Sequence, residues 1–456
     1  MQGKKLSYSA SPARLAALEV CGIIRTRKAF ASEIIGAQID SSDMIPADKA
    51  FATLLVLGVV STQGTLDEII DRSVHSSKNL EGRVRDSLRI SCYEIIFLGK
   101  SPYAAVDQGV ALVRSVTHKA AGLANAVLRK IVADKETFPF GNPETDFEAL
   151  SRLHAFPFWM TNLLVNELGF AAAKSFLEAS NSPAPLFIAV NSLKATSKEV
   201  QAVFREAGSE VAKVSLNKEA MAECFYVKDG KSLQAAGVKN LFAEGKILVS
   251  DAAAQLVVES ILPEKAPASF LEVGAGRGTK SILIQSAARR RYGEQIPLQV
   301  LDFHGFKIKI LKDRLAVYDA RLDKTHVIDA RKLDKTFKPK SFEMVFIDAA
   351  CSGLGTLRRH PEIRWRLQKE SISTMAKISY EILEETAKLV KVGGTLAYST
   401  CTVTREENQG VIETFLKSER GKNFRLEPIA GKASLSTQLR PGSSDAHFAV
   451  RMVRVG

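Results

Sequence analysis

Hydrophobic residues recur every three or four positions through the first third of the chain. Leu15, Leu18 and Cys21 share one face of an expected helix, and the nearly all-apolar segment 50–60 suits a helix buried at the centre of a bundle. Similar spacing continues through the segments that follow, and no strand-like alternation interrupts it. The pattern predicts an all-helical domain of roughly five to seven helices over residues 1–138.

The pattern changes after this domain. Two helical stretches, 159–168 and 171–179, precede an apolar strand at 186–191, and a helix and further short strands follow. This alternation predicts a small α/β subdomain over residues 139–235.

Apolar strands alternate with helix-length segments over residues 236–456. The expected strands are 270–273, 298–301, 325–328, 344–347 and 396–398. Strands separated by helices predict a doubly wound parallel sheet, so the chain is expected to be multidomain: an all-α bundle, a small α/β subdomain and a larger α/β domain.

The composition fits a folded protein of several domains. Of 456 residues, 46% are hydrophobic and 25% are charged, which excludes a disordered or fibrous chain. The formal net charge of +13 favours an anionic partner, although nucleic acid, an acidic membrane and simple solubility all remain open on charge alone. Most of this surplus lies beyond residue 140, in the part of the chain that carries the motifs described next.

The five cysteines are an odd number, are widely spaced and form no CxxC pair. This argues against a disulfide framework and a zinc site, and the scattered histidines suggest no other metal. The N-terminal residues lack the apolar core of a signal peptide, and the longest apolar run, 54–60, is too short to cross a bilayer. We therefore expect a cytoplasmic protein without a bound metal or a membrane partner.

A glycine-rich turn follows the expected strand 270–273. It is formed by Glu272, Gly274, Ala275, Gly276, Arg277, Gly278, Thr279 and Lys280. Glycines permit a tight turn and close approach to a ligand, although the spacing is neither that of a dinucleotide fingerprint nor that of a phosphate loop. Asp302 and Asp329 end the next two strands, where a carboxylate can accept hydrogen bonds from ribose hydroxyls. Together these residues predict a site for a nucleoside-bearing cofactor.

Two further motifs place a cysteine just beyond the end of a buried strand. Asp348 and Cys351 follow one strand and Cys401 follows another, so all three are expected at the ligand-binding edge of the sheet. Cysteine is often simply a core residue, and this is our interpretation of Cys21, Cys92 and Cys224. Cys351 and Cys401 lie in small, polar turn sequences, which favours a chemical role.

The motifs resemble the RNA cytosine-C5 methyltransferases. The sequences that carry this resemblance are Asp348-Ala-Ala-Cys351-Ser-Gly with the segment 357–365, and Tyr398-Ser-Thr-Cys401-Thr with Glu406-Glu-Asn408. More narrowly, the chain is similar to the RsmB (Sun/Fmu) family, which modifies small-subunit ribosomal RNA. Tyr93-Glu-Ile-Ile and the segment 120–129 resemble the NusB-like RNA-binding domain of that family.

The resemblance implies a fold and a reaction. It implies a NusB-like bundle followed by a class I (Rossmann-like) methyltransferase domain that uses S-adenosylmethionine. It also implies that Cys401 is the nucleophile that adds to carbon 6 of cytosine, that Asp348 binds the edge of the base, and that Cys351 assists release. Lys280 matches the lysine that closes the family's cofactor loop, and the partner is implied to be RNA bound by a protein that we expect to be a monomer.

Several positions depart from the family pattern. The departures are Gly274–Thr279 in the cofactor loop, Ala350 for proline, Ala189 for arginine, Ser250 for glutamine, and Ala446-His447 near the end of the chain. The generic cofactor loop survives these changes, so they bear on the RNA target and the efficiency more than on the reaction type.

Basic residues near Cys351 suggest contacts with RNA. Arg358, Arg359, Arg364 and Trp365 follow this cysteine directly, and the tryptophan could stack on a base. The leading hypothesis is methylation of a cytosine in 16S ribosomal RNA. The alternatives are the same reaction on transfer RNA or another RNA, and a non-catalytic RNA-binding or assembly factor that kept the fold.

Overall fold

A computed structural model gives the fold and describes residues 9–74, 80–217, 219–333 and 335–456. These residues form two compact units. The first, called the helical unit below, runs to Asn181 and includes Leu357–Leu367; the second, called the α/β unit, contains Ser182–Thr356 and Gln368–Gly456. Residues 139–181 thus pack with the helical unit, whereas the sequence pattern groups them with the small α/β subdomain.

The helical unit is built around one apolar core. Its helices are α1 (Pro12–Arg27), α2 (Ala31–Ile35), α3 (Pro46–Ser73), α4 (Gly82–Ile96), α5 (Pro102–Val116), α6 (Ala121–Asp134), α7 (Phe147–His154), α8 (Phe158–Leu168), α9 (Phe170–Asn181) and the short α15 (Ile363–Arg366). Proline occupies the first turn of α1, α3 and α5, where its missing N–H costs no hydrogen bond. Six α-helices lie within the described part of residues 1–138, in agreement with the predicted bundle.

Helix α3 is longer than the apolar segment 50–60 indicated. At 28 residues it is long and apolar enough to cross a membrane by length and composition alone, but half of its most apolar window is buried inside the protein. Leu55, Val56, Leu66 and Ile69 are fully buried in the core of the helical unit. The central helix of a bundle has this composition because it is covered by its neighbours on several sides.

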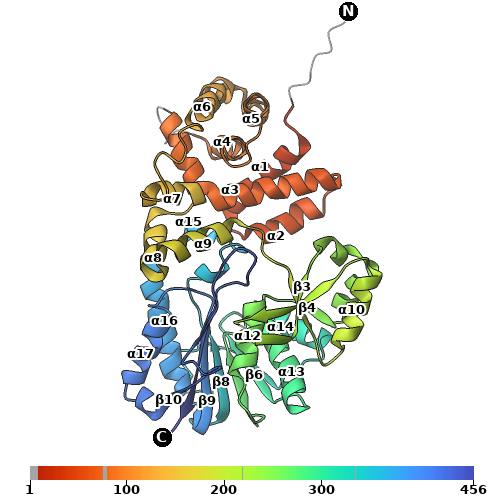
Figure 1. Ribbon diagram of the computed structural model, residues 1–456, viewed down its shortest axis with the longest axis vertical. Helices are drawn as coiled ribbons and strands as arrows, with labels where there is room; N and C mark the ends of the chain where they lie inside the picture. Colours follow the sequence, from red (N-terminus) through yellow and green to blue (C-terminus); the bar gives the residue numbers. More distant parts are fainter. Residues whose placement is uncertain (1–8, 75–79, 218, 334) are drawn as a thin grey trace, which may run out of the picture. The chain divides into compact units, whose positions relative to one another are not determined.

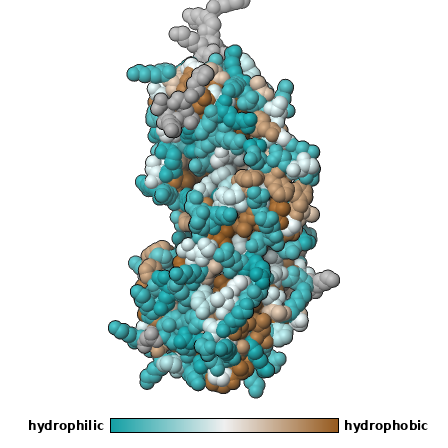
Figure 2. All heavy atoms as spheres, turned by 90° about the vertical axis from the view of Figure 1, so that its left-hand side faces the viewer, coloured by the Kyte–Doolittle hydropathy of each residue, from teal (hydrophilic) through white to brown (hydrophobic). Residues whose placement is uncertain are grey.

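Figure 2 shows hydrophilic residues over much of one face of the molecule, with hydrophobic residues in smaller groups.

The α/β unit begins with a small antiparallel sheet in the order β2-β3-β1-β4. Its elements are β1 (Phe187–Val190), α10 (Ser197–Glu206), β2 (Val211–Leu216), β3 (Glu219–Val227), α11 (Ala236–Ala243) and β4 (Ile247–Val249). Thr196 caps α10 with a reciprocal pair of hydrogen bonds to Glu199, which fixes where the helix starts. Strand β2 and helix α11 were not predicted, and β4 extends this sheet beyond residue 235.

The larger sheet has the order β10-β12-β9-β8-β5-β6-β7, with β11 paired to β12. The strands are β5 (Phe270–Val273), β6 (Leu298–Asp302), β7 (Lys324–Val327), β8 (Phe342–Asp348), β9 (Val390–Thr400), β10 (Phe424–Glu427), β11 (Leu435–Ser436) and β12 (Phe448–Arg454). Strands β5 to β9 are parallel to one another and match the five that were predicted, although β9 is much longer than 396–398. Strands β10 to β12 pair antiparallel and were missed.

Helices cover both faces of the larger sheet. Helices α12 (Ala252–Ile261), α13 (Thr279–Tyr292) and α14 (Gly305–Val317) pack on one face, and α16 (Glu370–Ala387) and α17 (Gln409–Lys417) on the other (Figure 1). Because β5, β8 and β9 are adjacent and parallel, the turns that follow them lie together at one edge.

Candidate active site

The two cysteines singled out in the sequence lie side by side at this edge. Cys351 follows β8 and Cys401 follows β9, and their sulfurs are 3.4 Å apart. The backbone N–H of Cys401 also points to the Cys351 sulfur at 3.4 Å. Both residues are partly exposed, whereas Cys21, Cys92 and Cys224 are buried in cores, as predicted.

The contact makes the two thiols chemically unequal. The hydrogen bond from Cys351 lowers the pKa of Cys401, against the effects of burial and of the Asp348 charge, and Lys280 assists. The same hydrogen bond, together with burial, raises the pKa of Cys351 well above its ordinary value. Of the two thiols, Cys401 is therefore the one that loses its proton first as the pH rises, and a nucleophilic cysteine requires this property.

This asymmetry predicts an order of alkylation. A lowered pKa places the thiolate of Cys401 at a lower pH than an ordinary thiol near ~8.5. As the pH rises from 6 to 9, iodoacetamide is expected to label Cys401 first and Cys351 later, with the buried cysteines unlabelled in the native protein. Mass spectrometry of peptides from the labelled protein measures this order, and labelling of Cys351 before Cys401 would contradict it.

Asp348 is held beside the cysteines at the end of β8. The Lys280 ammonium donates to its Oδ2 at 2.7 Å, and the Ser399 hydroxyl donates to its Oδ1 at 3.1 Å. Lys280 lies in the first turn of α13 and Ser399 lies near the end of β9, so the carboxylate is fixed from both neighbouring elements. A carboxylate held in this way can accept a hydrogen bond from a polar group of a ligand and keep its orientation.

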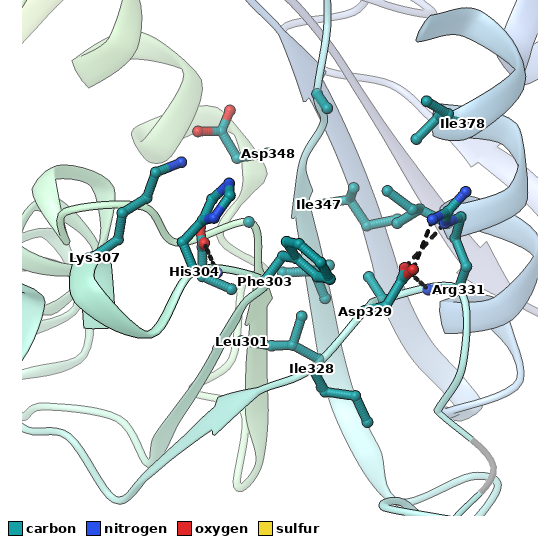
Figure 3. A pocket seen from close by; sticks show the side chains of 16 residues that line it. Leu301, Phe303, His304, Lys307, Ile328, Asp329, Arg331, Ile347, Asp348 and Ile378 are labelled. Atoms are coloured by element: carbon teal, nitrogen blue, oxygen red, sulfur yellow. Dashed lines mark hydrogen bonds and ion pairs between the residues drawn. The ribbon is translucent and has the colours of Figure 1, made fainter. Parts of the chain in front are cut away.

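A pocket of about 340 Å³ lies at the same edge (Figure 3). Among the predicted cofactor residues, Gly274, Asp302, Asp329 and Asp348 line it. Asp302 is further held by the backbone N–H groups of Gly276 and His304. Arg331 donates to Asp329 and lowers the pKa of that carboxyl, and the dashed lines in Figure 3 mark this ion pair.

The pocket suits S-adenosylmethionine in size and chemistry. Its volume lies in the range of small-molecule sites. Acidic side chains suit ribose hydroxyls, an amino group and a positive sulfonium, and an apolar wall that includes Ile328 and Ile347 suits an adenine ring. Gly274 has a φ of +80°, and a Cβ there would lie 2.4 Å from the Asp348 carbonyl oxygen, so the turn as it is built here favours glycine at this position.

Other predicted loop residues lie around the pocket rather than in its lining. The turn into α13 is formed by Ala275, Gly276, Arg277 and Gly278, and Thr279 and Lys280 are the first residues of the helix. Arg314 ties this turn down by donating to the Arg277 carbonyl and the Thr279 hydroxyl. Gly278 is left-handed, and a Cβ there would press on Leu311 and Leu315, so it permits α13 and α14 to approach.

The assignment of Glu272 to the cofactor needs correction. Its side chain is fully buried beneath the sheet edge, where burial raises the pKa of the carboxyl to about 8, and it accepts a hydrogen bond from Ser281 at 2.5 Å. It does not line the pocket. Successive side chains along β5 point to opposite faces of the sheet, and Glu272 points to the face that carries α13 and Ser281.

Sequence reasoning missed several lining residues, among them Phe303, His304, Lys307, Arg331, Ile378 and Ile382. Phe303 follows Asp302 directly and is 63% exposed, which is unusual for phenylalanine and consistent with a surface that a flat ring could cover. Its place after a strand-end aspartate is the sequence signal that could have identified it.

The proposed RNA contacts after Cys351 lie in the helical unit. Arg364 is fully buried, donates to Asn181 and to the Ser180 carbonyl at 2.7 Å, and stacks on Phe156. Trp365 donates to the Ser61 carbonyl at 3.0 Å. Arg364 is therefore a packing residue, and its assignment as an RNA contact is corrected. Trp365 is half-buried with its ring over Gly64, and Arg358 and Arg359 are half-buried.

Replacing Arg364 by alanine is expected to destabilise the protein by about 2–4 kcal/mol, because it leaves buried carbonyl oxygens without donors. Urea denaturation followed by circular dichroism measures the change. Arg366→Ala is the control, since Arg366 lies on the same short helix but is exposed, and it is expected to cost less than about 1 kcal/mol. Equal stabilities of the two variants would contradict the role of Arg364 in packing.

Within the described residues, no group of three or more metal-ligating side chains is found.

The residues that depart from the family pattern can be located in the fold. Ala189 lies in β1, Ala350 lines the pocket beside Cys351, and Ser250, Ala446 and His447 are buried.

Comparison with known proteins covers nearly the whole chain. The family model described as 16S rRNA methyltransferase RsmB/F matches residues 261–450. The NusB family model matches residues 11–133, and a ferredoxin-like domain model of RsmF/B-type methyltransferases matches residues 156–222. These matches agree with the predicted order of a NusB-like bundle, a small α/β subdomain and a Rossmann-like methyltransferase domain.

Individual relatives show the same coverage. A Synechocystis protein named "Probable ribosomal RNA small subunit methyltransferase B" is 31% identical over 91% of each chain. The Vibrio cholerae ribosomal RNA small subunit methyltransferase B is 29% identical over 87% of each chain. The crystal structure titled PH0851 has a TM-score of 0.78 at 23% identity and covers 98% of this chain and 99% of that one.

Proposed function

Because this chain belongs to the RsmB family of ribosomal RNA small subunit methyltransferases and its cofactor is S-adenosylmethionine, we propose that it methylates carbon 5 of a cytosine in 16S ribosomal RNA. The observation that carries the proposal is the contact between the Cys351 and Cys401 sulfurs, 3.4 Å apart, beside Asp348 and the pocket. Carbon 5 of cytosine is a weak nucleophile, so a thiolate has to add to the ring first.

Cys401 supplies this thiolate. Its sulfur forms a bond to carbon 6, and the electron pair moves to make carbon 5 an enamine carbon. Asp348 accepts a hydrogen bond from the amino edge of the base and orients the ring, while Lys280 and Ser399 hold the carboxylate. The base has to leave its stack to reach this edge.

Cys351 assists the last step. S-adenosylmethionine, when bound, supplies the methyl group from its sulfonium. Carbon 5 then loses its proton, the electron pair returns to the ring, and the bond between carbon 6 and the Cys401 sulfur breaks. The proton of carbon 5 passes to solvent water, and Cys351, in contact with the Cys401 sulfur, is placed to donate a hydrogen bond to that sulfur as it leaves as a thiolate. Asp302 and Asp329 would hold the cofactor through its polar groups, with Gly274 permitting the close approach.

The test of the reaction is release of tritium from RNA. RNA transcribed with cytidine labelled with tritium at carbon 5 is incubated with the protein and S-adenosylmethionine. Each methylation at carbon 5 is expected to release one tritium to water for each methyl group incorporated. Methyl incorporation without tritium release would show that another atom is methylated and would reject the proposal.

The target is tested separately. Bisulfite sequencing of RNA from a strain that lacks the gene is expected to show the loss of one protected cytosine in 16S ribosomal RNA. Loss in transfer RNA or another RNA would establish the alternative substrate, and no loss would favour the non-catalytic assembly factor. We further propose that the protein acts in the cytoplasm; the monomeric state stays a prediction.

A further inference from the structure

Glu407 is a buried carboxylate that contacts the loops of both cysteines. It lies between β9 and α17 and is fully buried. Its Oε1 accepts a hydrogen bond from the Ser352 backbone N–H at 2.6 Å. Its Oε2 accepts from the Ser352 hydroxyl at 2.6 Å, from Thr404 at 2.7 Å and from Thr402 at 3.1 Å.

The partners of this carboxylate are the direct neighbours of the catalytic sulfurs. Ser352 follows Cys351, and Thr402 follows Cys401. The Ser352 and Thr402 hydroxyls are themselves 2.7 Å apart, so the two loops meet at Glu407. The next residue, Asn408, bonds on both sides of Cys401, to the Thr400 hydroxyl and the Thr402 carbonyl. Glu407 thus ties one cysteine loop to the other.

We propose that Glu407 is a positioning residue for the methyl transfer: through Ser352 and Thr402 it holds the Cys351 and Cys401 sulfurs in contact. The inference rests on the proposed function, because it concerns the geometry of the two cysteines used there. Glu407 does not line the cofactor pocket, so it acts through its neighbours rather than on the reacting atoms.

The negative charge of Glu407 does not explain why a carboxylate is buried between the two cysteine loops. The pKa of Cys401 is lowered chiefly by the hydrogen bond from Cys351, and the negative charge of Glu407 works in the opposite direction. A carboxylate retained for electrostatics alone would oppose the nucleophile. What it offers is geometry: two oxygens that accept from hydroxyl and N–H donors on both loops at once.

Two conservative variants separate geometry from charge. Glu407→Asp keeps the negative charge but shortens the side chain by one methylene group, so the carboxylate cannot accept hydrogen bonds from both cysteine loops at once. Glu407→Gln keeps the length, and the hydroxyls can rotate to accept from its amide N–H groups. We expect kcat to fall about tenfold or more in the aspartate variant and no more than about threefold in the glutamine variant, with KM for RNA unchanged.

The pH profile gives a second readout. In Glu407→Asp the contact from Cys351 loosens, and the acid limb of the kcat profile is expected to move to higher pH. The groups that face Cys401 and set this limb are Cys351, Asp348, Lys280 and Glu407. Glu406→Gln is the matched control, since Glu406 is adjacent but exposed, and it is expected to match the wild type.

The outcomes are distinct. A larger loss in the aspartate variant, with normal cofactor affinity by calorimetry, supports the proposal. An equal or larger loss in the glutamine variant, or wild-type rates in both, overturns it. If Glu407→Asp does not fold, Ser352→Ala replaces it: slower release of RNA from Cys401 supports the proposal and a wild-type rate overturns it. Inactivity of Cys401→Ala with a normal Glu407→Asp rejects this inference alone, whereas normal activity of Cys401→Ala rejects the proposed function.

Discussion

Replacing Cys401 by alanine is expected to abolish methyl transfer to RNA. Without this sulfur no bond forms to carbon 6, and carbon 5 stays too weak a nucleophile to accept a methyl group. The expected loss is at least about 10⁴-fold in kcat, comparable to removal of a nucleophile in other covalent enzymes. Incorporation of tritiated methyl groups into RNA measures it, and binding of S-adenosylmethionine is expected to persist.

Cys351→Ala is expected to behave differently. The adduct still forms at Cys401, but its release is slowed, so RNA remains covalently attached to the protein. A band of protein with RNA that survives denaturing electrophoresis reports this state. Cys224→Ala is the control, because Cys224 is a buried core residue of the same unit, and it is expected to keep the wild-type activity. Normal turnover in Cys401→Ala, or no trapped RNA with normal turnover in Cys351→Ala, would contradict the roles given to the two cysteines.

Asp348→Asn is expected to reduce kcat about 10²–10³-fold at saturating cofactor. The amide cannot accept from both Lys280 and Ser399 as the carboxylate does, and it leaves the Lys280 ammonium without its ion pair. The base then loses an oriented acceptor at its amino edge. Rapid-quench measurement of methyl transfer gives kcat, and calorimetry gives the cofactor affinity.

Asp329→Asn provides the matched comparison. Asp329 lines the same pocket and is paired with Arg331 rather than with Lys280. Its replacement is expected to weaken cofactor binding about tenfold while kcat at saturation stays within twofold of the wild type. If the two variants lost kcat and affinity alike, Asp348 would have no role beyond cofactor binding.

The sequence allowed the larger sheet and the position of the chemistry to be predicted together. Runs of apolar residues with the length of a strand predicted β5 to β9, and parallel strands bring their carboxyl ends to one edge. This is why Gly274, Asp302, Asp348 and Cys401 could be expected from the sequence to lie at the same edge of the sheet. The antiparallel strands β10 to β12 were missed because they come after the regular alternation of strands and helices. Loops rather than helices separate one of these strands from the next.

Side-chain contacts were harder to predict. An arginine in a basic run is usually exposed, and only the tertiary structure shows that Arg364 is surrounded by Ser180, Asn181 and Phe156. Glu407 belonged to a motif that the sequence displayed, but its contact with Ser352 joins residues 55 positions apart and depends on the pairing of β8 with β9. Pattern and spacing identify which residues are near an edge, not which of them touch.

The segment Leu357–Leu367 has a consequence for how this protein can be divided. It is encoded within the methyltransferase half of the gene, yet its Arg364 fills a socket formed by Ser180, Asn181 and Phe156 of the first half. A fragment ending at Asn181 would lack the arginine that packs against these three residues. A fragment starting at Ser182 would contain Arg364 without the residues that bury it and accept its hydrogen bonds. A chimaera that exchanges the helical half between relatives would therefore have to exchange Leu357–Leu367 as well.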